Sequence, residues 1–360
     1  MDHKFTILFP LDGDMLNERD GTVQKDGSLA VTVKVDSDKS ITVNGVKASY
    51  IDGLYQAVVL LKDYANTILV SQAGGISETI KVYRLKNYVG KYRLSLDDNI
   101  WFLEDIAKHQ QTYKSIFENP YLQFMKQVHD EYGTKIHINI YYETENAFQL
   151  PMMPDQYKEE WIENATWLRL SFHAKADKPD KPYIHSSYEQ VEQDCSSVLK
   201  EIRRFAGEAM TGPVTTLHWG EATVEGCKAL RDCGYKCLVA DFNVDNELAE
   251  RVPVSYYLTL EQRRNVFKRF IWKDNQNDII FFRSAIIIDT HPVDKIEAFL
   301  NNIYNHPHQS AYMDLLIHEQ YFYPCYVGYQ PQYKEKILTA VRWAVNKGYQ
   351  PAFLEECVFE

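Results

Sequence analysis

The sequence has little positive charge, and this limits the partners that it can bind. Its 360 residues include 39 Lys and Arg against 50 Asp and Glu, which gives a net charge of −11 at pH 7. It shows no basic stripe of the kind that binders of duplex nucleic acid carry. We therefore expect neither nucleic acid nor an anionic membrane among its partners.

The sequence also lacks long apolar runs and paired cysteines. No run approaches the roughly 18–20 apolar residues that span a bilayer, and the opening MDHKFTILFP has no basic segment followed by a long apolar stretch. The absence of a CxxC pair is typical of free thiols in a reducing compartment. The cysteines are Cys195, Cys227, Cys233, Cys237, Cys325 and Cys357. These absences predict a cytoplasmic protein, and the sequence does not indicate its oligomeric state.

The first 84 residues differ in rhythm from the rest of the chain. Short alternating runs such as SLAVTVKV, SITVNG and ETIKVYRL are separated by Gly, Asp and Asn. This pattern is typical of an all-β sandwich. The stretch VNG…GLYQAVVLLKDYANTILV resembles the small immunoglobulin-like modules attached to bacterial carbohydrate-active enzymes. We therefore expect an immunoglobulin-like β-sandwich over 1–84, and an extracellular location stays open because such modules often lie outside the cell.

From residue 85 onward, strands alternate with helices. KYRLSLDD, KIHINIYYET, WLRLSF and YKCLVADF have the composition of strands, and SSYEQVEQDCSSVLKEIRRFAG has a helical apolar stripe that starts at a predicted capping box of Ser186 and Glu189. Such alternation predicts a largely parallel sheet, either open or closed into a barrel. The second domain is therefore predicted over 85–360 as an α/β fold.

Chemically active side chains recur where the predicted strands of this second domain end. Active sites of parallel α/β folds gather at the carboxyl ends of the strands. We therefore expect these side chains to share one rim. They are Asp97 and Asp98, His173, His218 and Trp219, Asp241, and Asp289 and His291.

The adjacent carboxylates of Asp97 and Asp98 indicate a cation site. Two ionised neighbours repel each other, and a cation would relieve that repulsion. A proline-containing loop joins His173 to His185 and could fold both rings onto one ion. One Asp and two His suit Zn²⁺ or another borderline divalent metal with open positions for water and substrate. The second carboxylate would then be free to act as a base.

These residues resemble the first two motifs of the polysaccharide deacetylases, the NodB-homology domains of carbohydrate esterase family four. SLDD matches a strand that ends in two Asp, and FHAKADKPDKPYIH offers two His with a longer gap than the family's H-[ST]-x-x-H. The resemblance implies Asp97 as general base. It implies Asp98, His173 and His185 as ligands of a divalent metal, with zinc first among the candidates.

The remaining motifs match less closely. TLHWGEAT, with His218 and Trp219, stands in the place of the family's R-x-P-Y-G and lacks its Arg and Pro. IIIDTH matches the strand-borne His, which implies His291 as general acid, and Asp241 could be the acid that tunes the base or the acid. We assign His218 and Trp219 to substrate binding, where Trp219 could stack on a sugar or simply pack in the core. The family fold implies a (β/α)7-type barrel.

The resulting expectation is a metal-dependent hydrolase that removes N- or O-linked acetyl groups from a carbohydrate substrate. Two alternatives stay open: a glycoside hydrolase that uses paired carboxylates without metal, and an inactive carbohydrate-binding protein. Asp97 or Asp98 could also merely cap the helix that follows. His318 and Glu319 are expected to form a polar helix end and not a second chemical site.

Overall fold

The computed structural model describes residues 5–145, 147–245 and 247–359. The chain forms two compact units. The first runs through Val89 and also takes in Ile271–Asp278 and the residues from Glu356 onward, and the second comprises Gly90–Phe270 and Ile279–Glu355.

The first unit is built from two β-sheets that share a core. One sheet has the order β1-β4-β8-β7 with β3 beside β4, and the other has the order β2-β10-β9-β5-β6. The strands are β1 Thr6–Phe9, β2 Met15–Leu16, β3 Thr22–Val23, β4 Leu29–Asp36, β5 Ile41–Val43, β6 Val46–Lys47, β7 Ser49–Ile51, β8 Leu54–Leu61, β9 Ala65–Gln72 and β10 Ile76–Arg84. Another strand, β16 Ile271–Asp274, belongs to the later segment of this unit.

Alternation along the strands explains this core. In β4, Val31, Val33 and Val35 are buried, whereas the residues between them are more exposed. They join Ile68 and Val70 of the other sheet in one apolar cluster. Period-two burial is what a sheet with one face on a core requires. The immunoglobulin-like topology stays a prediction.

Parallel strands form the centre of the second unit, which confirms the α/β character expected there. One sheet has the order β13-β12-β11-β19-β18, with β20 beside β11. Its strands are β11 Lys91–Asn99, β12 Ile136–Tyr141, β13 Leu168–Ala174, β18 Ile286–Ile287, β19 Tyr312–His318 and β20 Gln350–Pro351. In the next sheet β15 Cys237–Ala240 lies between β14 Val214–Thr216 and β17 Ile279–Arg283, parallel to both. β14 contacts β13, and a closed seven-stranded barrel stays a prediction.

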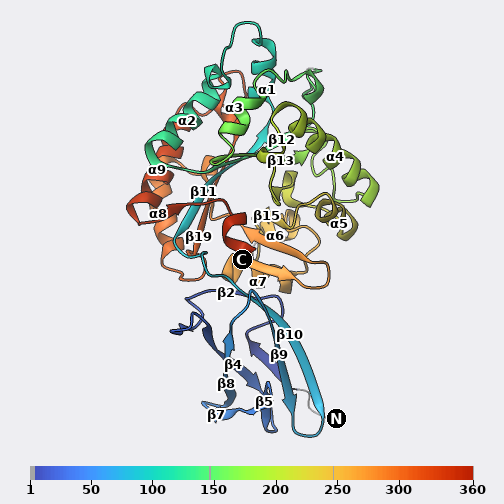
Figure 1. Ribbon diagram of the computed structural model, residues 1–360, viewed down its shortest axis with the longest axis vertical. Coiled ribbons are helices and arrows are strands. Elements are labelled where there is room, and N and C mark those ends of the chain that lie inside the picture. Colours follow the sequence, from blue (N-terminus) through green and yellow to red (C-terminus); the bar gives the residue numbers. More distant parts are fainter. Residues whose placement is uncertain (1–4, 146, 246, 360) are drawn as a thin grey trace. The chain divides into compact units, whose positions relative to one another are not determined.

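Helices flank these strands, with α2, α8 and α9 on one side and α4 and α5 on the other (Figure 1). Their bounds are α1 Trp101–Lys108, α2 Pro120–Tyr132, α3 Lys158–Glu163, α4 Tyr188–Phe205, α5 Val224–Asp232, α6 Glu247–Arg251, α7 Leu260–Arg269, α8 Val293–Tyr304, α9 Tyr333–Asn346 and α10 Glu355–Val358. The cap of α4 is Ser187, which accepts from the backbone N–H of Gln190. The predicted cap was wrong by one residue, because the Ser186 hydroxyl donates to the Tyr183 carbonyl instead.

The strands of the second unit carry a polar face. Arg93 and Asp97 of β11 alternate with apolar residues, as do His137, Asn139 and Tyr141 of β12. Arg93 donates to His137 Nδ1 at 2.9 Å, and Asn139 donates to Asp97 Oδ1 at 2.6 Å. Since these partners lie on neighbouring strands, the polar residues share one face of the sheet. That face leads to the carboxyl ends of the strands, where the candidate site lies.

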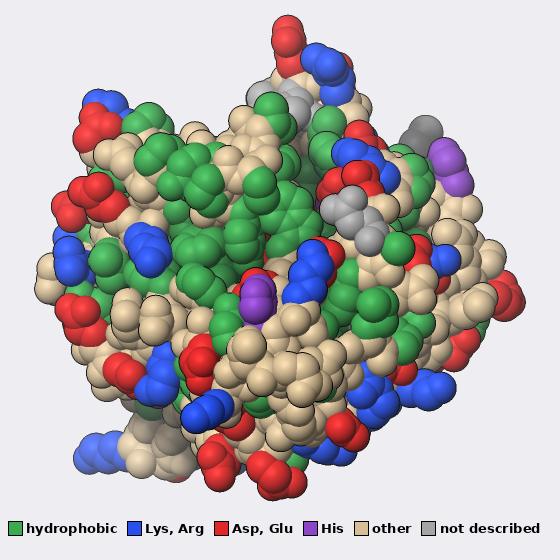
Figure 2. All heavy atoms as spheres, turned by 90° about the horizontal axis from the view of Figure 1, so that it is seen from above, with side chains coloured by type: hydrophobic (Ala, Val, Ile, Leu, Met, Phe, Trp, Pro, Cys, Tyr) green, Lys and Arg blue, Asp and Glu red, His purple; other side chains and the backbone are tan. Residues whose placement is uncertain are grey.

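The surface agrees with the mixed charge of the sequence. On the face shown in Figure 2, Lys and Arg are interspersed with Asp and Glu, and hydrophobic side chains gather towards the middle.

Among the helices that the structure describes, none combines the length and the apolar character needed to cross a bilayer.

Candidate metal centre and active-site pocket

The predicted strand-end residues meet largely in one pocket of the second unit. It has a volume of about 380 Å³. Six of the predicted site residues line it, namely Asp97, Asp98, His173, His218, Trp219 and Asp241. The expectation that strand ends converge on one rim therefore holds for most of the predicted residues.

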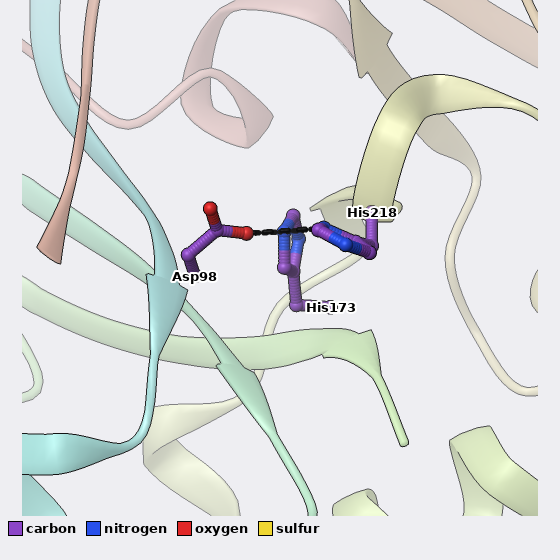
Figure 3. A group of neighbouring side chains, drawn as sticks. All are labelled: Asp98, His173 and His218. Atoms are coloured by element: carbon purple, nitrogen blue, oxygen red, sulfur yellow. Dashed lines mark hydrogen bonds and ion pairs between the residues drawn. The ribbon is translucent and has the colours of Figure 1, made fainter. Parts of the chain in front are cut away.

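Asp98, His173 and His218 form a compact cluster in this pocket (Figure 3). Asp98 Oδ1 lies 2.9 Å from His173 Nε2 and 3.0 Å from His218 Nδ1. The two ring nitrogens are 3.3 Å apart. Each residue offers one ligand atom, and these atoms all lie within 4.8 Å of one another. A carboxylate and two imidazoles that converge in this way are a donor set suited to zinc or a similar divalent ion.

Two irregularities in the sheet turn these side chains into the pocket. The β11–β12 ladder pairs Leu96 with Ile138 and then Asn99 with Ile140, so one extra residue lies in the Asp97–Asp98 stretch. Asp98 has a φ of 60°, in the left-handed region. The β12–β13 ladder shifts in the same way around His173. Bulges re-aim side chains at active sites, which here allows two adjacent carboxylates to line one pocket.

Backbone carbonyls orient both imidazoles. His173 Nδ1 lies 2.5 Å from the carbonyl of Thr216, and His218 Nε2 lies 3.2 Å from the carbonyl of Asp177. In each ring the other nitrogen faces Asp98. Ligating histidines usually donate their second ring N–H to such an outer partner, so the hydrogen bonding fits a metal-binding pair.

Hydrogen bonds and nearby charges shift the pKa values of the groups in this cluster and so decide which protons they hold. Burial opposes charge on Asp98, but hydrogen bonds from His173 and His218 hold the pKa of Asp98 well below its usual range. Burial also opposes charge on His173, yet the two aspartates raise its pKa. A bound cation would displace these protons, because metal ligands bind in their deprotonated forms.

Two further polar side chains contact Asp98. Gln320 donates to its Oδ2 at 2.7 Å. The buried Tyr141 donates to Oδ1 in a short hydrogen bond, and its hydroxyl lies 2.9 Å from His218 Nδ1. Burial and the charge of Asp98 raise the pKa of Tyr141 well above its usual range. Asp98 is therefore surrounded by donors on both oxygens.

Asp97 lies beside the cluster and has its own partner. It is 3% exposed and accepts from Asn139, and it pairs in register with His318 of β19. Burial raises the pKa of Asp97, and the charges of His173 and His318 oppose that rise. Asp97 is placed to take a proton from a molecule in the pocket.

His318 also lines the pocket, although the sequence suggested only a polar helix end there. Its Nδ1 lies 2.9 Å from Asp289 Oδ1. Burial lowers the pKa of His318, but Asp289 outweighs that effect and raises the pKa to about 10. The Asp289 carboxylate therefore favours the protonated form of His318, which can donate a proton.

Two predicted residues lie elsewhere, which corrects the expected site. His185 is exposed on the loop before α4 and is not part of the cluster, because the loop after β13 brings the Asp177 carbonyl to His218 and then turns outward. His218 takes its place beside Asp98. His291 lies outside the pocket described above and lines a separate one, with its ring against Phe299.

Trp219 and Asp241 line the pocket but contact different partners. Trp219 is 37% exposed, and Lys181 Nζ lies 5.9 Å from the centre of its ring. Asp241 is ion-paired to Arg283, whose Nη2 lies 2.7 Å from Asp241 Oδ1. The predicted tuning of the base or the acid by Asp241 therefore has no contact to support it, since its carboxylate is held by an arginine.

The sequence analysis missed Asn139, Tyr141, His318 and Gln320. A signal was present for the first two, because IHINIYY alternates Ile with His, Asn and Tyr in a strand that is buried on both faces. Polar side chains in such a strand need partners. For His318 the signal was its position after the apolar run YMDLLI, the same strand-end rule that identified the other residues.

Comparisons with known proteins give weak likenesses only. No protein-family description matches the chain, and no curated protein matches it. Among solved structures, a CE4 family pseudoenzyme from Bacillus anthracis is 9% identical, with a TM-score of 0.36, over 77% of this chain and 68% of that one. A CE4 esterase from Streptococcus mutans is 12% identical, with a TM-score of 0.39, over 74% and 86%.

A third likeness is to a 4-alpha-glucanotransferase from Thermococcus litoralis, which is 14% identical with a TM-score of 0.46. It covers 74% of this chain, which spans only 40% of that protein. Similarities at this level assign no residue role and no activity, so the function has to be argued from the pocket.

Proposed function

We propose that this protein is a metal-dependent hydrolase that removes an acetyl group, N- or O-linked, from a carbohydrate. The observation that carries the proposal is the convergence of Asp98, His173 and His218 in a pocket that also exposes Asp97 and His318. Three metal donors, a neighbouring carboxylate that can act as a base and an imidazole that can act as an acid together suit the metal-assisted hydrolysis of an amide or ester.

Asp98, His173 and His218 would hold the ion, with zinc as the first candidate. Both imidazoles turn one nitrogen to a backbone carbonyl and the other to Asp98, which fits ligation. A divalent ion held there supplies Lewis-acid chemistry, because it polarises an acyl carbonyl and makes water more acidic.

The remaining steps fall to Asp97 and His318. Asp97 takes the proton of the attacking water, and Asn139 fixes one of its oxygens through a 2.6 Å hydrogen bond. His318, held by Asp289, gives its proton to the leaving amine or alcohol. This assignment replaces the predicted His291, because His318 lines the pocket, whereas His291 lines a separate one.

Aromatic side chains in the pocket favour a carbohydrate as the substrate. Trp219 and Tyr321 both line the pocket, and Trp219 is substantially exposed. Aromatic rings offer flat apolar faces with polar edges, which suits the mixed surface of a sugar. The pocket also contains Asp177 and Lys178, which can hydrogen-bond to hydroxyl groups.

Metal content of the purified protein tests this proposal. We expect about one equivalent of a divalent ion in the wild type, lost in Asp98→Ala, His173→Ala and His218→Ala because each removes one of three donors. His185→Ala is the matched control and should keep its ion, since His185 is exposed and outside the cluster. A wild type that binds no ion after reconstitution would contradict the proposal.

Acetate release from acetylated oligosaccharides, with and without a chelator, then separates the alternatives. The proposed mechanism requires that activity disappears with the ion and returns on reloading. Sugar cleavage that survives chelation would instead support a glycoside hydrolase with paired carboxylates. Glycan binding without turnover would support a binding protein, an option favoured by the Tyr141 hydroxyl that lies among the metal donors.

A further inference from the structure

A second pocket of the same unit lies next to the candidate active site. It has a volume of about 360 Å³ and is lined by residues that follow β18 and by residues at the start of α9. They include Asp289, His291, Gln330, Gln332 and Lys336. The proposed hydrolysis uses only the Asp289 carboxylate of this group, so the other side chains need a separate explanation.

Lys336 brings a buried positive charge to this second pocket. The residue is 7% exposed, and its ammonium donates to the Asp289 carbonyl at 3.0 Å and to Gln330 Oε1 at 2.6 Å. Both acceptors are neutral, and an ammonium has three donors. Burial lowers the pKa of Lys336, although the charge of Asp289 opposes this. A buried charge without a paired anion is costly, and a bound anion would offset that cost.

The Asp289 carboxylate does not neutralise Lys336, because it is engaged on its other side. Its Oδ1 accepts from the backbone N–H of His318 at 3.1 Å and lies 2.9 Å from His318 Nδ1. One carboxylate therefore serves two basic side chains, since its charge also acts on Lys336. This leaves an excess of positive charge where His318 lines the first pocket and Lys336 lines the second.

The start of α9 favours an anion for an independent reason. This helix has 14 residues, and Gln332 at its N-terminal end provides no side-chain cap. The first backbone N–H groups of a helix lack partners within it, and together with the helix dipole they attract anions. Gln330 and Gln332, which line the second pocket, immediately precede the helix.

His291 adds a ring nitrogen to the same pocket. Its Nδ1 lies 3.1 Å from the carbonyl of Ile287, and its ring packs against Phe299. Because a carbonyl only accepts, Nδ1 carries a proton and Nε2 is left to meet a ligand. In the protonated ring Nε2 is also a donor, so an anion in the pocket would gain a second charged partner.

We propose that the second pocket binds an oxyanion, a carboxylate or a phosphate group, on the carbohydrate substrate. This inference rests on the proposed function and narrows its substrate class to acidic glycans. The two pockets are neighbours, because the backbone N–H of Gln330 in the second donates at 3.0 Å to the carbonyl of Tyr321 in the first. A glycan that reaches both would be held by its acidic group while its acetyl group lies in the first pocket.

NMR of the metal-free, full-length protein tests this proposal without any turnover. The probes are glucuronic acid, glucose 6-phosphate and, as the neutral comparison, glucose. The ring signals of His291 are followed, after assignment by their loss in His291→Gln. We expect saturable shifts with glucuronic acid, with glucose 6-phosphate or with both, and none with glucose. The probe that binds identifies the oxyanion as a carboxylate or a phosphate.

Two variants locate the binding at the second pocket. Lys336→Met should weaken it about tenfold or more, because a charge-assisted hydrogen bond is lost. Lys334→Met is the matched control, since Lys334 is exposed on the same helix and does not line the pocket. Gln332→Asp should also weaken binding by repulsion, and it is expected to fold because Asp is a good helix cap. Gln332→Asn is its uncharged control.

Three results would overturn the proposal. They are equal shifts with glucose, no shift with either acidic probe, and an affinity that is unchanged in both Lys336→Met and Gln332→Asp. Failure of the proposed function gives a different result, because a protein that binds acidic sugars but takes up no metal keeps the anion site and loses the hydrolase.

Discussion

At the scale of single residues, the register between β11 and β19 places His318 opposite Asp97 and therefore in the pocket. In the sequence Asp289 and His291 are two positions apart, and both were expected on the rim of the site. In the structure Asp289 instead accepts from His318, and His318 pairs with Asp97 across the ladder. Pairing between distant strands is a tertiary property, so the local sequence did not show which histidine lies in the pocket.

The Asp289–His318 pair predicts a pH-dependent stability of the metal-free protein. The pKa of His318 is raised from its ordinary 6.5 to about 10, so its charged form stabilises the fold fully below pH 6.5, and this contribution is lost as the pH rises through 10. Asp289→Asn removes the charge that raises it. The free energy of unfolding in urea should therefore differ between wild type and variant much more at pH 6 than at pH 10.5.

Histidine NMR of the stripped protein provides the control, since His318 should titrate at a lower pH in Asp289→Asn. An equal stability difference at both pH values would show that the pair contributes through packing and not through charge.

At the scale of elements, strand ends and helix patterns were predictable and bulges were not. The rule that chemical residues follow apolar strands found Asp97, Asp98, His173 and His218 from local sequence alone. The extra residues in β11 and β13 leave no local signal, because any residue type can occupy a bulge. Loop paths were equally hidden, and for this reason the sequence analysis grouped His185 with Asp98 and His173, whereas the structure places His218 beside them.

The start of α1 depends on one carboxylate from another element. Glu319, which follows β19, accepts from the backbone N–H groups of Ile100, Trp101 and Phe102 at 2.6–3.0 Å. These N–H groups have no partner within the helix. Burial raises the pKa of Glu319 to about 7, although these hydrogen bonds oppose the rise.

Glu319→Ala should therefore lower the free energy of unfolding by about 1–3 kcal/mol at pH 8, because it leaves buried donors unsatisfied. Urea denaturation followed by circular dichroism measures this change. Glu319→Gln keeps one acceptor oxygen and should be intermediate. The exposed Glu335 in the first turn of α9 is the matched control, and its replacement by Ala should stay within about 0.5 kcal/mol. Equal effects at 319 and 335 would refute the capping role.

At the scale of the whole molecule, the first unit is assembled from separate parts of the chain. Ile271–Asp278 belongs to it, although the sequence predicted one continuous domain over 1–84. Gly13 shows how close the segments lie, since its carbonyl accepts from Lys273 N at 2.9 Å and the Trp272 indole donates to the Asp12 carbonyl. The sequence pattern showed the change from β-strands to alternating strands and helices near residue 85. It could not show that β16 joins the first unit, because that contact is non-local.

Gly13→Ala tests the closeness of these segments. Gly13 has a φ of 82°, and a Cβ there would collide with the carbonyl oxygen of Lys273. The free energy of unfolding should fall by about 3 kcal/mol, from backbone strain and overpacking together. Gly45 has a similar φ of 78° with nothing within 4 Å, so Gly45→Ala isolates the strain alone at about 1 kcal/mol. Urea unfolding of both variants measures the difference, and equal losses would contradict a close approach at residue 13.

The divided first unit also has a consequence for biosynthesis. A ribosome that has made the strands up to Arg84 must still translate all of Gly90–Phe270 before Ile271–Asp278 can join them. At typical elongation rates that interval is about 10–40 s. During this time the nascent first unit lacks Ile271–Asp278. This segment arrives only after most of the pocket residues have left the exit tunnel.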